Sequence, residues 1–182
     1  MRHLSTEELI AGLAELGRSP ADGGRLEMIV RRPDVGEREM VDEGWLDVDD
    51  GLIGDSWRQR EGWRMIRGQR HRNMQLNLMN ARAIALIAQD RSQWPLAGDQ
   101  LFVDLDLAPA NLPPWSRLAL GDAVIEVTDE PHTGCAKFVK RFGVDAMKFV
   151  NSTVGRAMNL RGMNARVVTG GAIRVGDIAR KL

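Results

Sequence analysis

Hydrophobic residues recur at helical spacing near the N-terminus, directly after a helix-capping pattern. Ser5 stands three residues before Glu8, so a hydroxyl and a carboxylate have the spacing of a capping box. We predict an amphipathic helix that ends at Gly17, within an N-terminal helical extension of residues 1–24. The apolar positions of this helix are Leu9, Ile10, Leu13 and Leu16.

From residue 25 onwards, short segments alternate apolar and polar residues or are rich in β-branched residues, and Gly, Pro or Asp closes most of them. The first, from Arg25 to Arg31, is stopped by Pro33, and we expect the main domain to begin here and to run to residue 182. Short strands bounded by turns predict a barrel or a strongly coiled sheet. The other predicted strands are 36–41, which is weak, 100–105, 123–127, 165–169 and 172–175.

Three segments of this domain have helical composition. Residues 79–89 are rich in Ala, Ile and Leu without a helix breaker, which predicts a mostly buried helix. Residues 136–142 and 145–158 are predicted to form two further helices. Gly51 and Gly54 are expected to set backbone bends in the loop that contains them. Together the pattern predicts an α+β fold, predominantly β, in which helices flank a barrel.

The composition narrows the possible functions mainly by exclusion. Hydrophobic residues make up 43% of the chain and charged residues 27%, and no apolar run approaches the roughly 20 residues of a membrane span. Glu7 and Glu8 interrupt the region where a signal peptide needs an apolar core, so we expect a cytoplasmic protein without a membrane role. Because 25 basic and 25 acidic residues cancel, nucleic acid is an unlikely partner.

Cys135 is the single cysteine, so the chain can form neither an internal disulfide nor a four-cysteine zinc site. It follows a predicted strand and loop and stands directly before a predicted helix. The free backbone N–H groups at a helix N-terminus, together with Lys137 and Lys140, are expected to favour its thiolate form. Such a thiolate can ligate a soft metal or carry sulfur.

Two neighbours of Cys135 bear on this chemistry. His132 lies three residues earlier and could act as a base or a hydrogen-bond donor, and Gly134 allows close approach of the backbone. A lone cysteine is also often a small buried hydrophobe, so a structural role stays open. The His132-x-x-Cys135 spacing is half of a zinc pattern, but neither His3 nor His71 supplies the other half.

The order of several short motifs around Cys135 resembles the MOSC domain, the family named after the C-terminal domain of molybdenum-cofactor sulfurase. The resemblance spans about residues 25–178 and is strongest over 98–177. The motifs are Gly51-Leu52-Ile53-Gly54-Asp55, Gly98-Asp99-Gln100-Leu101 with Asn111-Leu112, the segment 121–128 before the cysteine loop, the segment 161–168, and Gly176-Asp177.

The resemblance implies a MOSC-type β-barrel, similar to the pyruvate kinase barrel, over residues 25–182. It implies that Cys135 is the molybdenum ligand or a sulfur carrier, with His132 as a second catalytic candidate. The activity would be that of a molybdenum-dependent oxidoreductase, for example on N-hydroxylated compounds, or of a sulfur transferase. The alternative is a non-catalytic module that binds a small anion or a cofactor. The implied cofactor contacts are Asn111, Thr133, Lys137, Arg161 and Arg166.

These activities need partners that the chain does not contain. The molybdenum cofactor (molybdopterin) is the expected cofactor, and no pyridoxal phosphate is expected, because no region like the pyridoxal-phosphate domain of sulfurases precedes residue 25. No flavin, haem or iron–sulfur motif is present either. Electrons or sulfur would therefore come from a separate donor protein, and the ligand would be a small molecule or the cofactor itself.

The most basic stretch of the chain lies between Trp57 and Arg72. Guanidinium groups suit phosphates, and tryptophan faces suit a pterin or a nucleic acid base. The same side chains could instead pair with the acidic stretch 42–50, as charge runs on solvated surfaces commonly do. The residues of this stretch are Trp57, Arg58, Arg60, Trp63, Arg64, Arg67, Arg70, His71 and Arg72.

Overall fold

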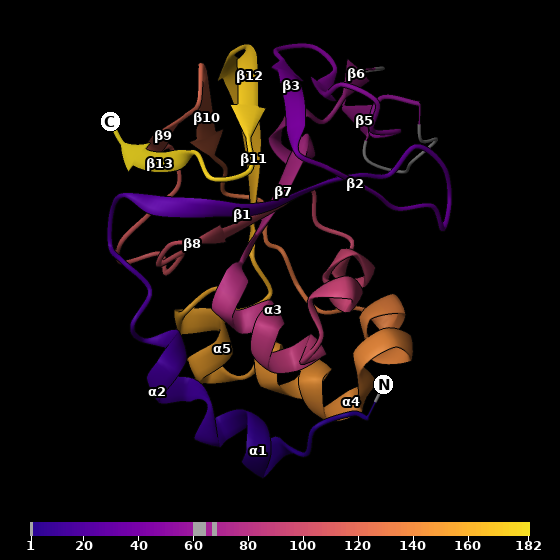
Figure 1. Ribbon diagram of the computed structural model, residues 1–182, viewed down its shortest axis with the longest axis vertical. Helices are drawn as coiled ribbons and strands as arrows, with labels where there is room; N and C mark the ends of the chain where they lie inside the picture. Colours follow the sequence, from indigo (N-terminus) through magenta and orange to yellow (C-terminus); the bar gives the residue numbers. More distant parts are fainter. Residues whose placement is uncertain (1, 60–64, 67–68) are drawn as a thin grey trace.

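The protein consists of a β-barrel and a layer of helices beneath it (Figure 1). This computed structural model describes residues 2–59, 65–66 and 69–182. About 30% of the chain is strand and 29% is helix. The predicted α+β fold with a barrel and flanking helices is confirmed.

Seven strands in the described part of the chain close the barrel, in the order β13-β9-β10-β11-β7-β8-β1, with β1 pairing back to β13. All neighbours are antiparallel except β7 and β8, which are parallel. The short strand β2, Glu39–Val41, extends the sheet beyond β1. The barrel strands are β1 Gly24–Arg31, β7 Leu76–Asn80, β8 Leu101–Asp104, β9 Arg117–Leu120, β10 Ala123–Val127, β11 Met163–Thr169 and β13 Ile178–Lys181.

Two small sheets lie beside the barrel. One places β3 (Glu43–Asp47) between β12 (Gly171–Arg174) and β4 (Gly51–Leu52), and the other pairs β5 (Met65–Ile66) with β6 (Gln69–Arg70). The φ angles of Gly51 and Gly54 are 75° and 88°, which confirms the bends predicted at both glycines.

The described helices occur in three groups along the chain, 6–16, 72–97 and 136–157, and the α-helices gather on one side of the barrel (Figure 1). None of the described helices is both long and apolar enough to cross a membrane. The N-terminal capping box is present, with Ser5 and Glu8 exchanging hydrogen bonds, but the helix is broken at Gly12 into two short pieces. The helices are α1 Thr6–Ala11, α2 Leu13–Leu16, η1 Arg72–Met74, α3 Ala81–Ala88, η2 Arg91–Ala97, α4 Ala136–Asn151 and α5 Thr153–Ala157.

Some predicted boundaries were wrong. The helix predicted from Met79 begins at Ala81, because Met79 belongs to β7 and Asn80 caps the helix by accepting a hydrogen bond from Ala83 N–H. An apolar run without a breaker does not separate a buried strand from the buried helix that follows it. Gly143, with a φ of 89°, divides α4 into two helical segments, which confirms the predicted helix 136–142. The second predicted helix, 145–158, is interrupted at Ser152, so that its first part belongs to α4 and its last part is α5. The strands that the prediction missed are β3, β4, β5, β6, β7, β9 and β13.

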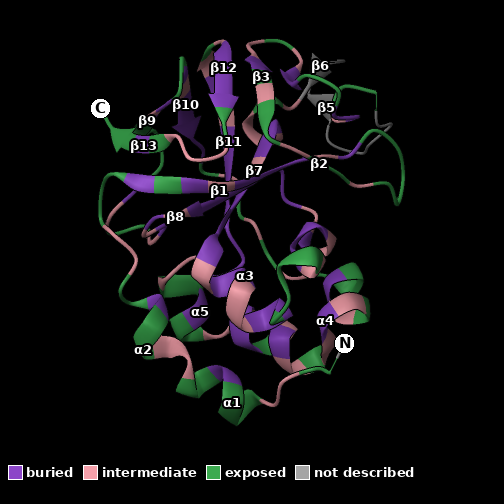
Figure 2. Ribbon diagram, viewed as in Figure 1, coloured by how far each residue is buried: buried purple, intermediate pink, exposed green. Residues whose placement is uncertain are grey.

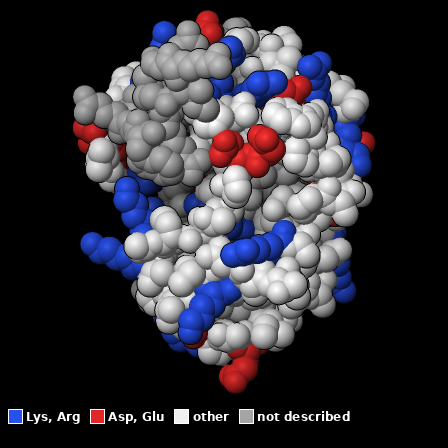
Figure 3. All heavy atoms as spheres, turned by 180° about the vertical axis from the view of Figure 1, so that it is seen from behind, with Lys and Arg blue, Asp and Glu red and all other residues white. Residues whose placement is uncertain are grey.

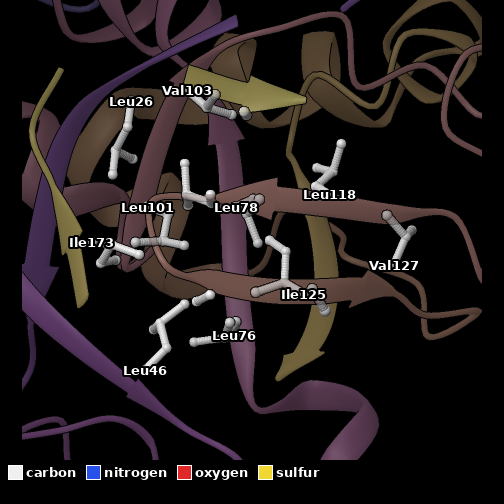
Figure 4. Close-up of a cluster of buried hydrophobic side chains, with 14 of the residues drawn as sticks. Leu26, Leu46, Leu76, Leu78, Leu101, Val103, Leu118, Ile125, Val127 and Ile173 are labelled. Atoms are coloured by element: carbon white, nitrogen blue, oxygen red, sulfur yellow. The ribbon is translucent and has the colours of Figure 1, made fainter. Parts of the chain in front are cut away.

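Two hydrophobic cores lie on opposite sides of the barrel wall. Leu101 and Val103 of β8 point into the barrel, while Phe102 between them packs against the helices. Figure 4 shows the barrel core, with Leu101, Leu78 and Ile125 converging from different strands. Figure 2 shows that α3 is largely buried under the barrel. Because β1, β7 and β8 have apolar faces on both sides, they resemble the buried strands of a two-layer fold.

The wall formed by β9, β10 and β11 instead carries charged residues on its outer face. Ala165 and Val167 point into the barrel, so Arg166 between them points outward. Glu126 lies opposite Arg117 and Arg166 on the neighbouring strands and pairs with both. The hydrogen bond from Arg117 and the nearby Arg166 hold the pKa of Glu126 below its usual value.

Candidate functional site

Cys135 is the N-cap residue of α4, at the point where the loop after β10 becomes helical. Its backbone carbonyl accepts hydrogen bonds from Phe138 and Val139 N–H, and its side chain makes no capping hydrogen bond. The residue is exposed. The predicted position at a helix start is confirmed, and the alternative of a buried hydrophobic cysteine is wrong.

The loop that carries Cys135 is fastened to the barrel at its beginning. Thr128 N–H donates to the carbonyl of Asn164 at 3.0 Å, and Thr128 Oγ1 donates to the carbonyl of Asn73 at 2.6 Å. The buried Asn164 side chain donates to the carbonyl of Glu130 at 3.0 Å. These bonds fix the path of the backbone before His132.

The end of the loop is fastened to α4. Gly134 N–H donates to Asn151 Oδ1 at 2.9 Å, and Asn151 Nδ2 donates to the Gly134 carbonyl at 3.2 Å. A Cβ atom on residue 134 would lie only 3.1 to 3.3 Å from Val150, Asn151 and Met147. Gly134 therefore permits the close backbone approach that the sequence predicted.

A cavity of about 270 Å³ lies beside the loop, between the loop and the segment around α5. Thr133, two residues before Cys135, lies in its wall, whereas Cys135 itself does not. None of the described residues that line the cavity is acidic. The lining residues are Pro131, His132, Thr133, Val150, Asn151, Gly155, Arg156, Asn159 and Arg161.

A buried ion pair supports the cavity wall. Arg161 Nη1 donates to both carboxylate oxygens of Asp99, at 2.7 and 3.0 Å, and Arg161 Nη2 donates to the carbonyl of Ala97. The Asp99 side chain is fully buried, and His132 Nδ1 lies 3.5 Å from Asp99 Oδ1. Within the described residues, His132 Nδ1 and Arg161 Nε are buried without a hydrogen-bond partner.

His132 is uncharged at neutral pH. Burial lowers its pKa to about 3, and the positive charges of Arg161 and Arg32 act in the same direction, while Asp99 opposes them. A histidine that is neutral in this way can donate or accept a hydrogen bond, but it is a weak base. The environment favours a hydrogen-bonding role for His132 over proton abstraction.

A second buried ion pair holds the turn that carries Asp99. Arg32 binds both oxygens of Asp55, with Nε to Oδ2 at 2.7 Å and Nη2 to Oδ1 at 2.9 Å. Its Nη1 also donates to Asn77 and to the carbonyl of Gly98. Asp55 and Asp99 belong to the motifs of the MOSC resemblance, in which neither had a predicted role, and Arg32 was not predicted as a site residue. The pair Arg31-Arg32 at the end of a strand gives no local signal that separates a buried arginine from an exposed one.

Two predicted contacts lie away from the cavity. Asn111 is in a turn, where its Nδ2 donates to the carbonyls of Ala21 and Asp106 and its Oδ1 accepts a hydrogen bond from Lys181. Arg166 is on the outer barrel wall, where it pairs with Glu126. The structure places Thr133, His132 and Arg161 together at the cavity, and it places Lys137 on the exposed first turn of α4. Asn151, Arg156 and Asn159 line the cavity and were not predicted.

The described part of the basic stretch pairs locally. Arg58 forms an ion pair with Asp50, and Arg72 donates to the carbonyl of Val48 and lies 3.9 Å from Asp49. For these two arginines the predicted pairing with the acidic stretch is confirmed. His71 pairs with Glu130. Figure 3 shows basic and acidic side chains dispersed over the rear face. Arg60, Trp63, Arg64 and Arg67, and the side chain of Arg70, lie outside the described residues.

No zinc site forms around Cys135 within the described residues. The His, Cys, Asp and Glu side chains of this part of the chain nowhere gather in a group of three that could hold a metal ion. His3 contacts the carbonyl of Arg141 and His71 contacts Glu130, so neither completes a site with His132.

Comparison with solved structures identifies the architecture. YiiM from Geobacillus stearothermophilus matches with a TM-score of 0.60 and 12% identity over 87% of this chain and 75% of that chain. YiiM proteins are members of the MOSC domain family. The chain has a MOSC-type fold. YiiM from Escherichia coli matches with a TM-score of 0.54 and 19% identity, covering 87% of this chain and 69% of the other.

A further match is the YuaD protein from Bacillus subtilis, with a TM-score of 0.59 and 19% identity over 86% of this chain and 93% of that chain. No family model and no curated protein matches the sequence. At these identities the likeness concerns the MOSC-type fold, and the chemistry of the site has to be argued from the residues of this chain.

Proposed function

We propose that this protein binds the molybdenum cofactor or carries sulfur through the thiolate of Cys135. The observation that carries the proposal is the exposed thiol of Cys135, at the point where the loop after β10 becomes helical. Its exposure leaves the sulfur open to a metal or to a sulfur donor. A thiolate is a soft ligand, suited to molybdenum and to sulfane sulfur.

The surrounding residues fit a cofactor that combines a soft metal with oxygen-rich groups. Cys135 offers the sulfur ligand, while Arg156 and Thr133 offer N–H and O–H donors in the adjacent cavity. His132, neutral at pH 7, would hydrogen-bond to a bound group without adding charge. When bound, the molybdenum cofactor would supply two-electron redox chemistry, and a separate protein would supply the electrons.

As a sulfur carrier, the chain needs only the Cys135 thiolate. The thiolate attacks the terminal sulfur of a persulfide on a donor protein, so a bond forms between Cys135 Sγ and that sulfur. The S–S bond of the donor breaks, and the donor leaves as a thiolate. The exposed position of Cys135 would give a donor protein access to the sulfur.

A non-catalytic binding module is the second candidate. It is favoured by the fact that Cys135 does not line the cavity, so the cavity could hold a small anion or a cofactor without involving the thiol.

Metal and sulfur analysis of the full chain tests the proposal. The protein is produced in a host that makes the molybdenum cofactor, and its molybdenum content and the mass of the Cys135 peptide are measured. Cofactor binding is supported if the wild type contains near-stoichiometric molybdenum and Cys135→Ser contains none. The carrier role is supported if the Cys135 peptide carries one added sulfur atom. The control is Arg180→Gln, an exposed position on β13. Folded protein with neither molybdenum nor sulfur would overturn the proposal in favour of the binding module.

A further inference from the structure

We infer that the cavity beside the cysteine loop binds the anionic end of a small sulfur donor of the thiosulfate class, from which Cys135 takes sulfur. This inference rests on the proposed sulfur-carrier role and names a substrate class for it. Its support comes from the absence of acidic residues in the described cavity wall, from the charge of Arg156 in that wall, and from the connection between the wall and the thiol.

The cavity wall is selectively non-acidic. Two arginines, two asparagines, a threonine and a neutral histidine line about 270 Å³, and none of the described lining residues is a carboxylate. The chain as a whole has equal numbers of acidic and basic residues. The absence of acidic residues from the wall is therefore a local feature. Because Asn151, Asn159 and Arg161 already donate within the protein, Arg156 is the residue of the wall that suits an oxyanion.

The two arginines of this wall differ in their charge balance. Asp99 offsets the charge of the buried Arg161, which holds the wall in place. Arg156, exposed on α5, forms no ion pair within the described part of the chain, so its charge is available to a ligand. Arg161 is 7% exposed and uses its Nη groups on Asp99 and Ala97, so Arg156 is the arginine that can contact a ligand.

The cavity and the thiol share one support. Asn151 lines the cavity, and its side chain also binds both backbone groups of Gly134, the residue before Cys135. Thr133, on the other side of Gly134, is in the cavity wall as well. An anion held by Arg156 would therefore be presented to the loop that carries the thiol.

The transfer step balances without a further reactant. The Cys135 thiolate attacks the outer, sulfane sulfur of thiosulfate, and a bond forms between Cys135 Sγ and this sulfur. The S–S bond of thiosulfate breaks, and its electron pair leaves with sulfite. Cys135 becomes a persulfide, and Arg156 stabilises the anionic charge of the departing sulfite.

Sulfate and thiosulfate separate binding from transfer. Sulfate binding is followed by titration with NMR or calorimetry, and sulfite release from thiosulfate is measured with the mass of Cys135. Cys135→Ser should keep sulfate binding and lose sulfite release. Arg156→Gln should weaken sulfate binding about tenfold, as expected for one charge-assisted hydrogen bond, and slow sulfite release. Arg156→Lys should retain part of both, and Arg180→Gln should change neither.

The outcomes distinguish this inference from the proposed function. Equal sulfate binding by wild type and Arg156→Gln, or no binding by folded wild type, would overturn the cavity as an anion site. If an uncharged trisulfide still loaded Cys135 with sulfur in that case, the sulfur-carrier role would survive with a different donor. A third result is possible, in which sulfate binding depends on Arg156 but Cys135 accepts sulfur from no donor and binds no molybdenum. This result would overturn the proposed function and the transfer step, and only the anion site would remain.

Discussion

Asn151, the last residue of α4, binds both backbone groups of Gly134, which lies just before the start of the same helix. A straight helix of 16 residues would be about 24 Å long and would keep these ends apart. The chain turns at Gly143, whose φ of 89° interrupts the helix. The kink therefore brings the end of α4 back to the loop that carries Cys135.

Replacing Asn151 should loosen the cysteine loop. Asn151→Ala removes two hydrogen bonds to Gly134, so we expect the free energy of unfolding to fall by about 1 to 2 kcal/mol. We also expect faster hydrogen exchange of the Gly134 amide. Asn151→Asp keeps the acceptor for Gly134 N–H and should have an intermediate effect. Unchanged exchange at Gly134 in Asn151→Ala would show that other contacts hold the loop.

The Asp99 and Arg161 pair should be essential for stability. Asp99→Asn leaves the guanidinium of Arg161 buried without its counter-charge, which costs about 3 to 5 kcal/mol for pairs of this kind. Urea denaturation measures the loss. Glu37→Gln, at an exposed position, is the matched control and should change stability by less than about 0.5 kcal/mol. Similar urea midpoints for Asp99→Asn and Glu37→Gln would show that the Asp99–Arg161 pair is not essential for stability.

Stability should decrease on mild acidification because of His132. Its folded-state pKa of about 3 lies below the ordinary value of 6.5, so the unfolded chain binds more protons between these values. The contribution of uncharged His132 to the free energy of unfolding is complete above about pH 6.5, and it is lost as the pH falls towards 3. Between pH 7 and 5 we expect a loss of roughly 1 to 2 kcal/mol from this residue. Urea unfolding of wild type and of His132→Gln at both pH values tests this, and the variant should lose less stability on acidification. An identical pH dependence in the two proteins would show that His132 does not contribute.

A side chain at position 162 should be poorly tolerated. Gly162 follows Arg161 with a φ of 103°, and a Cβ there would lie 2.0 Å from the carbonyl oxygen of Leu78. Gly162→Ala should therefore reduce the thermal midpoint well beyond the loss in Gly36→Ala. Gly36 also has a positive φ, of 88°, but no atom lies within 4 Å of the added carbon. Gly36→Ala is the control, and backbone strain alone should lower its stability by about 1 kcal/mol. Equal midpoints would mean that β7 can shift to make room.

The sequence was informative where a local pattern carries the structure. The capping box at Ser5, the strands β1 and β10, the bends at Gly51 and Gly54, and the helix start at Cys135 follow from residues that are neighbours in the chain. Capping, turn formation and alternation act over a few residues, so they can be recognised without the fold. The resemblance of ordered motifs extended this to the barrel architecture.

The tertiary structure decided which polar residues meet. Arg161 and Asp99 are 62 positions apart, and Asn151 is 17 positions from Gly134, so no local spacing relates them. Arg166 and Asn111, also predicted as contacts, lie elsewhere because the alternation of β11 directs Arg166 outward and a turn uses Asn111. The sequence by itself determined that the single cysteine stands at the start of a helix. Barrel closure and the kink at Gly143 determined what surrounds it, because long-range pairing depends on the packing of the whole chain.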